Sequence, residues 1–181
     1  MPHPALEPLF VARLASPIGT MLVVFDTDDR LRALDWSDYA ARLQHLLKRY
    51  WGTHGQAFTL KETAPPAPLR IALDHYFAGD LAAIEHLRVH LGGTPFQRAV
   101  WQALRAIPAG QTVSYGALAR EIKRPLAVRA VGAANGANPI GIVVPCHRVI
   151  GANGALTGYG GGLSRKRWLL THEGVTLKVE H

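Results

Sequence analysis

The residue pattern of this 181-residue chain changes at Gly92-Gly93. Before this pair, apolar runs within residues 9–36 are separated by the turn-forming stretches SPIGT and DTDD, which predicts three short antiparallel strands. After it, apolar residues recur at helical spacing between capping residues and glycines. The change predicts an α+β fold with two domains: a small N-terminal antiparallel sheet with helices over 1–91, and a helical domain over 92–181.

Two helices are predicted in the first half. Residues 39–52 carry leucines at helical spacing and end in a glycine. After a proline-rich linker, a second helix is expected from about Pro68 to Phe77. The stretch 81–93 is ambiguous between strand and helix, because its apolar residues fit either period.

The second half carries strong start and stop signals for helices. Thr94 and Gln97 form a capping-box sequence, and the apolar residues that follow at i, i+4, i+8 and i+11 mark one buried stripe. Ser114 caps a short helix, the basic turn KRP follows, and Pro125 begins another helix. Two short helices joined by a tight basic turn predict a helix-turn-helix. A last helix is expected over about 163–173.

The positive charge of the chain lies entirely in its second half. Residues 1–93 carry 9 Lys and Arg against 10 Asp and Glu, a net charge of −1. Residues 94–181 carry 11 against 3, a net charge of +8. A polyanion is the natural partner for such a half, and nucleic acid is the commonest. A basic surface without a partner is the alternative that charge alone leaves open.

Cys146 is the one cysteine of the chain, which excludes an internal disulfide and any zinc site with two thiolates. We therefore expect no metal site. The apolar runs fall short of the roughly 20 residues that a membrane helix needs. The first residues, MPHPALEP, lack the basic start and apolar core of a signal peptide. These features predict a cytoplasmic protein without membrane contact.

The second helix of the predicted helix-turn-helix is almost bare, in the sense that most of its side chains are small. It carries Ala127, Ala130 and Gly132, and its one long polar side chain is Arg129. Helices that read bases in the major groove usually carry several long polar side chains. A bare helix instead allows close approach to a narrow minor groove, or tight packing against its own core. Composition leaves both interpretations open, and both can hold on opposite faces.

The lone thiol lies in the stretch IVVPCHRVI, between Pro145 and His147. A cysteine reacts as the thiolate; His147 can take its proton and Arg148 can favour the anion. If the stretch is extended, however, adjacent side chains point to opposite faces, so a bridging water or a bend at Pro145 is needed. Glu173 or Glu180 can orient the histidine. A buried, inert cysteine is the alternative interpretation.

Three stretches carry a family resemblance. PCHRVI at 145–150, LTGYGGGLSRKRWLLTHEG at 156–174 and FQRAVWQALRAIPAGQTVSYGALA at 96–119 resemble the O6-alkylguanine-DNA alkyltransferases, also called methylated-DNA–protein-cysteine methyltransferases. The likeness spans about residues 92–175. It implies a winged helix-turn-helix in the second half, no cofactor, and a variable N-terminal domain in the first.

The resemblance also implies roles in the chemistry. Cys146 matches the acceptor of the alkyl group, and His147 matches the base that acts on it through water. Glu173 matches the carboxylate that orients the histidine, and Asn138 the asparagine that supports this network. Tyr115 matches the phenol that donates to guanine N3 as the base leaves.

Other positions match the residues that hold the nucleobase and the DNA. The Cys146 and Val149 carbonyls would accept from the exocyclic amine of guanine, and the Gly160 N–H would reach O6. Tyr159 would line the pocket. Arg129 matches the arginine that takes the place of the rotated nucleotide, and the small residues near it would contact the minor groove: Ala127, Ala130 and Gly132, with Tyr115.

The implied function is DNA repair: single-turnover transfer of an alkyl group from O6 of guanine in double-stranded DNA to Cys146. Methyl and larger groups are expected, and O4 of thymine is left open. We expect a monomer in solution, able to bind as several molecules along DNA. Two alternatives stand beside this function: a helix-turn-helix regulator without chemistry, and a cysteine-dependent hydrolase that ignores DNA.

Overall fold

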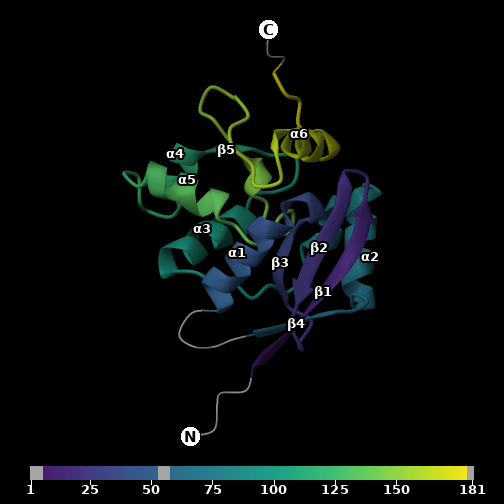
Figure 1. Cartoon of the computed structure of the whole chain (residues 1–181). Coiled ribbons are helices and arrows are strands. Elements are labelled where there is room, and N and C mark those ends of the chain that lie inside the picture. Colours follow the sequence, from purple (N-terminus) through teal and green to yellow (C-terminus); the bar gives the residue numbers. More distant parts are fainter. Residues whose placement is uncertain (1–5, 53–57, 179–181) are drawn as a thin grey trace, which may run out of the picture.

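The computed structural model describes residues 6–52 and 58–178 and has an α+β architecture (Figure 1). The first half forms a four-stranded sheet in the order β3-β2-β1-β4. The strands are β1 (Glu7–Ser16), β2 (Gly19–Phe25), β3 (Leu31–Trp36) and β4 (Phe58–Glu62). The three strands predicted from the sequence are confirmed, and they pair as an antiparallel meander.

Strand β4 was not predicted, and it makes the sheet mixed, because it pairs parallel to β1 at the edge. Its residues after Phe58 are all exposed, so the stretch lacks the alternation of apolar and polar side chains that marks a half-buried strand. Backbone pairing with β1 holds this edge strand in place rather than burial of its side chains.

Both faces of the sheet are covered. In β2, Met21, Val23 and Phe25 face the main core, whereas Leu22 and Val24 face a smaller cluster with helix α1 (Ala40–Trp51). Burial on both faces explains why this strand is a continuous apolar run. The predicted helix α2 (Ala67–Phe77) is present and packs on the main-core side, and it is followed by a single 3₁₀ turn, η3 (Leu81–Ile84).

The second half is helical, as predicted. Its helices are α3 (Pro95–Arg105), α4 (Tyr115–Glu121), α5 (Val128–Gly136) and α6 (Leu163–His172), with a short parallel pair, β5 (Val113–Ser114) and β6 (Val149–Ile150). The capping box at α3 is present: Thr94 Oγ1 accepts from Gln97 N at 3.1 Å, and Gln97 Oε1 accepts from Thr94 N at 2.9 Å. Ser114 Oγ caps α4 by accepting from Ala117 N.

Two local expectations are corrected. Helix α5 begins at Val128 rather than Pro125, because residues 122–127 form a turn that Lys123 enters with a left-handed φ of 59°. The residues before Cys146 are not extended either. Ile142 has a φ of 66°, and Cys146–Arg148 form a 3₁₀ turn, η4. The chain therefore bends just before the thiol.

Backbone hydrogen bonds join the two halves beside this bend. Leu34 N in β3 donates to Pro139 O at 2.9 Å, and Gly141 N donates to Leu34 O at 2.9 Å. One apolar core runs from the sheet into the helices of the second half. The division after residue 91 stays a prediction, and the segment around Cys146 is fixed by both halves.

Candidate active site

Cys146 opens the 3₁₀ turn η4, and its residue is 7% exposed. Pro145 before it has ψ 66°, so the chain bends there, which was one of the two alternatives that the sequence left open. The turn is followed at once by β6, so the thiol stands between a strained loop and a short strand. Access to the sulfur is therefore narrow, and its electrostatic surroundings come from protein groups rather than from bulk water.

His147, Arg148 and Glu173 meet in a buried cluster behind the thiol. The Glu173 carboxylate accepts from His147 Nε2 at 2.9 Å and from Arg148 Nε and Nη2 at 2.9 and 2.7 Å. Tyr76 from the N-terminal half donates its hydroxyl to the same carboxylate at 2.7 Å. The contact to Glu173 was expected from the resemblance, whereas Glu180 lies outside the described residues.

The protonation of this cluster follows from its charges. Burial works against the Glu173 anion, but the hydrogen bonds from Arg148 and His147 outweigh it and hold the pKa of Glu173 well below its usual range. Burial lowers the pKa of His147 below its usual value. An ionised carboxylate only accepts, so Nε2 of the neutral imidazole carries the proton, and Nδ1 is left as a base.

His147 does not contact the sulfur directly. Among the described residues, Nδ1 of His147 is buried without a hydrogen-bond partner, and no hydrogen bond links the imidazole to Cys146. The turn places consecutive side chains in different directions, so a direct cysteine–histidine pair does not form. The geometry fits a base that takes the proton through one bridging molecule.

Burial raises the pKa of the Cys146 thiol. The Asn138 side chain and the positive charges of Arg42 and Lys166 act against this effect. Arg148, which the sequence suggested as the cation that favours the thiolate, is committed to Glu173 and to the Ile107 carbonyl, to which it donates at 2.6 Å. That suggestion was wrong, because the neighbouring residue in the chain faces away from the sulfur.

Two asparagines hold the bend. Asn138 Nδ2 donates to Val144 O at 2.8 Å and to Ile140 O at 3.3 Å, while its Oδ1 accepts from Ile140 N. Asn135, at the end of α5, donates to Cys146 O at 3.4 Å. Asn138 thus fixes the backbone of the bend, and Asn135 links α5 to the thiol-bearing residue.

Lys166 is a site residue that the sequence did not reveal. It is fully buried in α6, and its Nζ donates to Val149 O and Thr157 O at 2.6 Å each and to Gly158 O at 3.3 Å. Burial lowers its pKa to about 8, and the nearby Cys146 charge acts in the opposite direction. The ammonium ties β6 to the loop that leads to Tyr159.

Arg42 reaches the site from α1 in the N-terminal half. It pairs with the buried Asp35 at 2.6 Å and donates to Gly136 O and Asn138 O at 2.8 and 3.1 Å. Its guanidinium lies against Gly160, where an added Cβ would stand 2.6 Å from Arg42 Cζ. Glycine at this position is therefore what lets the arginine cover the loop.

Tyr159 and Val149 also lie near Cys146. The Tyr159 hydroxyl lies over Gly141, and burial together with the Cys146 charge raises its pKa well above the usual value. The Val149 carbonyl already accepts from Lys166, and the Cys146 carbonyl accepts from Asn135 and from Val149 N.

Tyr115 and the residues of α5 occupy a more open surface. Half-buried Tyr115 exchanges hydrogen bonds with Thr157, and its ring lies against Gly132, where an added Cβ would be 3.7 Å away. Arg129 and Ala130 are exposed, and Ala127 is half-buried. Arg129 and Asn135 are six residues apart on α5, so about 9 Å of helix separates the exposed end from the thiol end.

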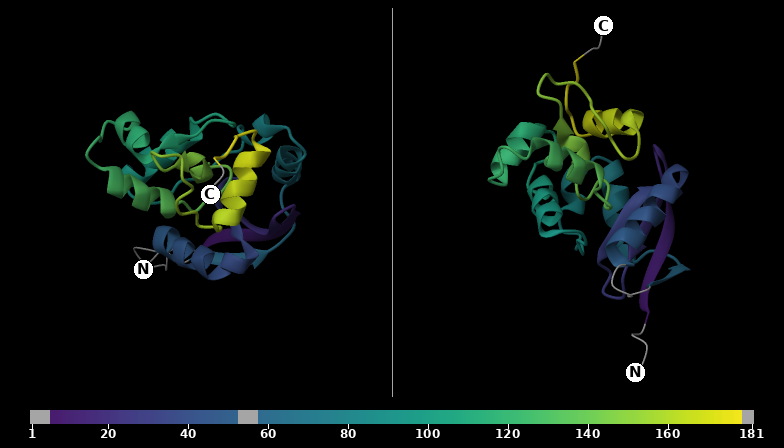
Figure 2. Two further views of the ribbon diagram at one scale, coloured as in Figure 1. Left: turned by 90° about the horizontal axis from the view of Figure 1, so that it is seen from above. Right: turned by 60° about the vertical axis from the view of Figure 1, so that its left-hand side comes forward.

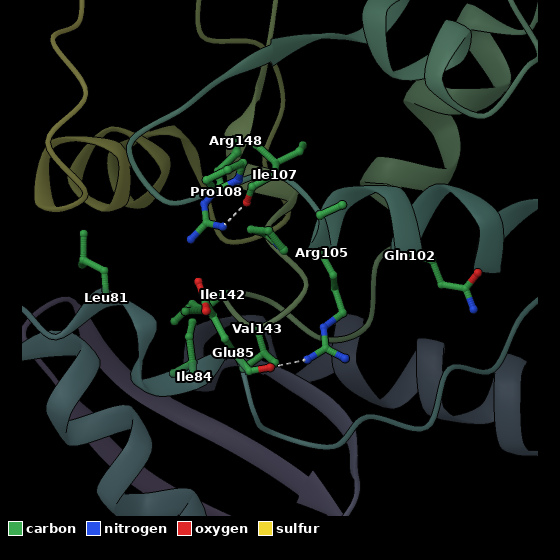
Figure 3. Close-up of a pocket in the computed structure, with 12 residues that line it drawn as sticks. Leu81, Ile84, Glu85, Gln102, Arg105, Ile107, Pro108, Ile142, Val143 and Arg148 are labelled. Atoms are coloured by element: carbon green, nitrogen blue, oxygen red, sulfur yellow. Dashed lines mark hydrogen bonds between the residues drawn. The ribbon is translucent and has the colours of Figure 1, made fainter.

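A cavity of about 540 Å³ lies behind the bend (Figure 3). Residues of η3, α3 and the thiol-bearing bend line it, among them Ile84, Val143 and Pro145. Arg148 borders it where its guanidinium donates to Ile107 O. Cys146, Tyr159 and Gly160 are not among the residues that line it.

Over 6–52 and 58–178, no group of three or more His, Cys, Asp or Glu side chains is arranged to hold a metal ion. Within the same residues, every helix is too short or too polar to span a bilayer.

Two family models cover most of the chain. The 6-O-methylguanine DNA methyltransferase DNA-binding domain matches residues 95–175, and the ribonuclease-like domain of the same methyltransferases matches residues 9–91. The chain belongs to the 6-O-methylguanine DNA methyltransferase family. The resemblance seen in the sequence is confirmed, and it extends into the N-terminal half.

Individual family members can be aligned with this chain over nearly its full length. The chain is 54% identical to the methylated-DNA–protein-cysteine methyltransferase of Salmonella typhimurium and 50% identical to that of Shigella flexneri, in each case over 93% of this chain and 98% of the relative. The crystal structure of Mycobacterium tuberculosis OGT in complex with DNA matches with a TM-score of 0.76 and 42% identity, over 91% of this chain and 92% of that one.

Proposed function

We propose that Cys146 is the residue onto which this methyltransferase takes an alkyl group from O6 of guanine in DNA. The family is that of DNA repair proteins which transfer the group to one of their own cysteines, and Cys146 is the one cysteine of the chain. The observation that carries the assignment is the buried Cys146–His147–Glu173 arrangement beside the DNA-binding helices.

The transfer is a single displacement at carbon. The Cys146 sulfur bonds to the alkyl carbon while the carbon–O6 bond breaks, and guanine leaves with the electron pair. The thiol proton passes through a bridging water to His147 Nδ1, which Glu173 keeps available by accepting from Nε2. Tyr115 donates a proton to guanine N3, so the base leaves neutral. The thioether that forms is not a leaving group, so each molecule acts once.

Arg42, Lys166 and Asn138 favour the thiolate that must form during this step. Their effects oppose the burial that otherwise raises the Cys146 pKa. The base itself is held by Tyr159, by the Val149 carbonyl and by the Gly160 N–H. Gly160 leaves room for Arg42 above the loop, which keeps that cation close to the reacting sulfur.

The chain binds double-stranded DNA through α4 and α5. We place α5 in the minor groove, because its exposed residues are small and Arg129 stands at its start. The guanine must leave the base stack to reach Cys146, at a cost of a few kcal/mol. Arg129 fills the space it leaves, and Ala127, Ala130 and Gly132 allow the helix backbone to approach.

The decisive experiment is mass spectrometry after incubation with a duplex that carries one O6-methylguanine. The peptide containing Cys146 should gain one methyl group, whereas the Cys146→Ala variant should bind the duplex and gain none. An unmodified Cys146 peptide in the wild-type protein would refute the proposal. Duplexes with larger O6-alkyl groups or O4-methylthymine extend the same assay to those substrates.

The oligomeric state and the arrangement of several molecules on DNA can be measured by sedimentation. We expect a monomer in solution and several molecules side by side on longer duplexes. Sedimentation of the free protein, and of complexes with duplexes of increasing length, measures both. A dimer in the absence of DNA would contradict this expectation.

A further inference from the structure

One large apolar side chain stands out by its exposure. Leu126 is 100% exposed, whereas the other exposed large apolar residues of the described chain reach at most 50%. Val128, two residues later, is also exposed at 38%. Single exposed apolar residues are common on protein surfaces, but a completely exposed leucine leaves its full hydrophobic contribution unused until a partner covers it.

Leu126 lies in the turn between α4 and α5, which projects at the edge of the molecule in the left-hand view of Figure 2. The turn is tied by Arg124 N to Ala119 O at 2.8 Å and by Ala127 N to Arg124 O at 2.9 Å. The leucine is thus presented by an ordered turn rather than by a loose loop.

The surroundings of Leu126 are basic. The exposed cations near it in the chain outnumber the single exposed carboxylate, which belongs to Glu121. These cations are Arg120, Lys123, Arg124 and Arg129. An exposed leucine surrounded by cations fits a partner that has an apolar surface between two rows of anionic groups. The minor groove of a DNA duplex has this character, since phosphates border deoxyribose C–H groups.

We propose that Leu126 enters the minor groove beside Arg129 and makes an apolar contact with sugars and base edges there. The inference rests on the proposed DNA-repair function and adds a binding residue to it. Apolar side chains that insert into the minor groove, leucine among them, help to unstack neighbouring bases. Ala127 and Ala130 have short side chains, so the longer side chain of Leu126 extends beyond them.

An apolar contact and a phosphate contact differ in their salt dependence. Each phosphate neutralised by a cation releases counterions and adds about 0.9 to the slope of log K against log salt. An apolar contact releases none. Removing Leu126 should therefore weaken binding by a constant factor at every salt concentration, whereas removing a neighbouring cation should change the slope.

The test is fluorescence anisotropy of a labelled duplex between 50 and 200 mM NaCl, with the variants Leu126→Ala and Arg124→Ala. We expect Leu126→Ala to bind about tenfold more weakly at all salt concentrations with an unchanged slope. Arg124→Ala should lower the slope by about 0.9. Ile71→Ala, which removes an exposed apolar residue of α2, is the matched control and should bind like the wild type.

Two results would overturn the inference: binding by Leu126→Ala that equals the wild type, or a loss confined to low salt. Thermal unfolding of the variant should be unchanged, because an exposed side chain contributes little to the fold. Transfer from free O6-benzylguanine should be unchanged as well. If the wild type takes no methyl group from DNA, the proposed function fails; if it does and Leu126→Ala binds normally, only this inference fails.

Discussion

The bend around Cys146 and the start of α5 are built on opposite principles. Around the bend, the charged groups are buried and bonded to one another: Glu173 to His147 and Arg148, and Lys166 to three carbonyls. At the start of α5, Arg129, Ala130 and Leu126 are exposed. If the proposed function is correct, the difference teaches that reaction and recognition are separable, because the polar groups around the bend are bonded within the protein whereas the exposed groups at the start of α5 await a partner.

The separation can be measured with two substrates. Free O6-benzylguanine needs the residues that hold the base and react with it, whereas methylated duplex also needs the contacts of α5 with DNA. A change in the bend should slow both reactions equally, and a change at the start of α5 should slow only the reaction with duplex. The ratio of the two rates therefore reports which region a residue serves.

The largest effect is expected from Glu173→Gln. The amide cannot neutralise Arg148 or hold His147 as a carboxylate does, and breaking a buried charge pair costs about 3–5 kcal/mol. Both reactions should fall by more than about 100-fold, and urea unfolding should show the loss of stability. Unequal losses with the two substrates would break the proposed separation. Tyr76→Phe, which removes one donor to the same carboxylate, should have a smaller effect on both.

The same cluster predicts acid sensitivity. The Glu173 pKa is lowered in the fold, so its contribution to stability is present above the unfolded pKa of about 4.3 and is lost as pH falls below it. The His147 pKa is also lowered, so protonation below about pH 6.5 opposes folding. Melting temperature should fall from about pH 6.5 downwards in the wild type, and the part of the fall below about pH 4.3 should be missing in Glu173→Gln, which has no carboxylate to protonate. Identical pH profiles for the two proteins would argue against this cluster as the source.

Arg129→Ala should give the clearest contrast. We expect the rate with methylated duplex to fall by about 10–100-fold, because the variant lacks the side chain that we propose fills the place of the rotated base. The rate with free O6-benzylguanine should not change. Arg167→Ala, which removes an exposed arginine from α6, controls for the loss of charge alone. Equal losses on both substrates would remove the proposed role of Arg129.

Lys166→Met tests the cation near the sulfur. Without the ammonium, the Cys146 pKa should rise, and a rise of one unit lowers the thiolate fraction, and hence the rate, about tenfold. The pH profile of iodoacetamide alkylation measures this shift, which a merely structural role would not produce. Lys178→Met, at an exposed lysine, should leave the profile in place.

The smallest effect is expected from Gly160→Ser. The new Cβ would lie 2.6 Å from Arg42 Cζ, so the guanidinium must shift from its place over the loop. Because the end of a long side chain can move, we expect a loss of only a few-fold, equal for both substrates. Pairing the change with Arg42→Met should abolish the difference between glycine and serine. A persisting difference would place the effect in the loop itself.

Much of this arrangement could be predicted from short-range patterns. The capping box at Thr94, the strands around SPIGT and the pairing of His147 with a carboxylate all follow from neighbouring residues or from family motifs. Lys166 could have been found, since it shares a helix face with Leu169 and Leu170 at i+3 and i+4. The basic run RKR concealed it, because such runs usually face solvent.

Nothing in the sequence indicated that Arg42 belongs to the site. It lies on an amphipathic helix among leucines, where an arginine is typical of the exposed face, and its partners Gly136 and Asn138 are 94 and 96 residues away. Its role depends on how the two halves pack. The parallel strand β4 was missed for a related reason, since its pairing partner is set by the tertiary fold rather than by its own side chains.

The hollow behind Pro145 has a mechanical consequence for the spent protein. An alkyl group added to the Cys146 sulfur needs space, so it would displace the turn η4, and a close-packed interior would resist that displacement. Here Val143, Pro145 and Arg148 border open space, so we expect the turn to shift towards it. We expect the depth of this hollow to set how bulky an adduct the folded protein tolerates before the turn gives way.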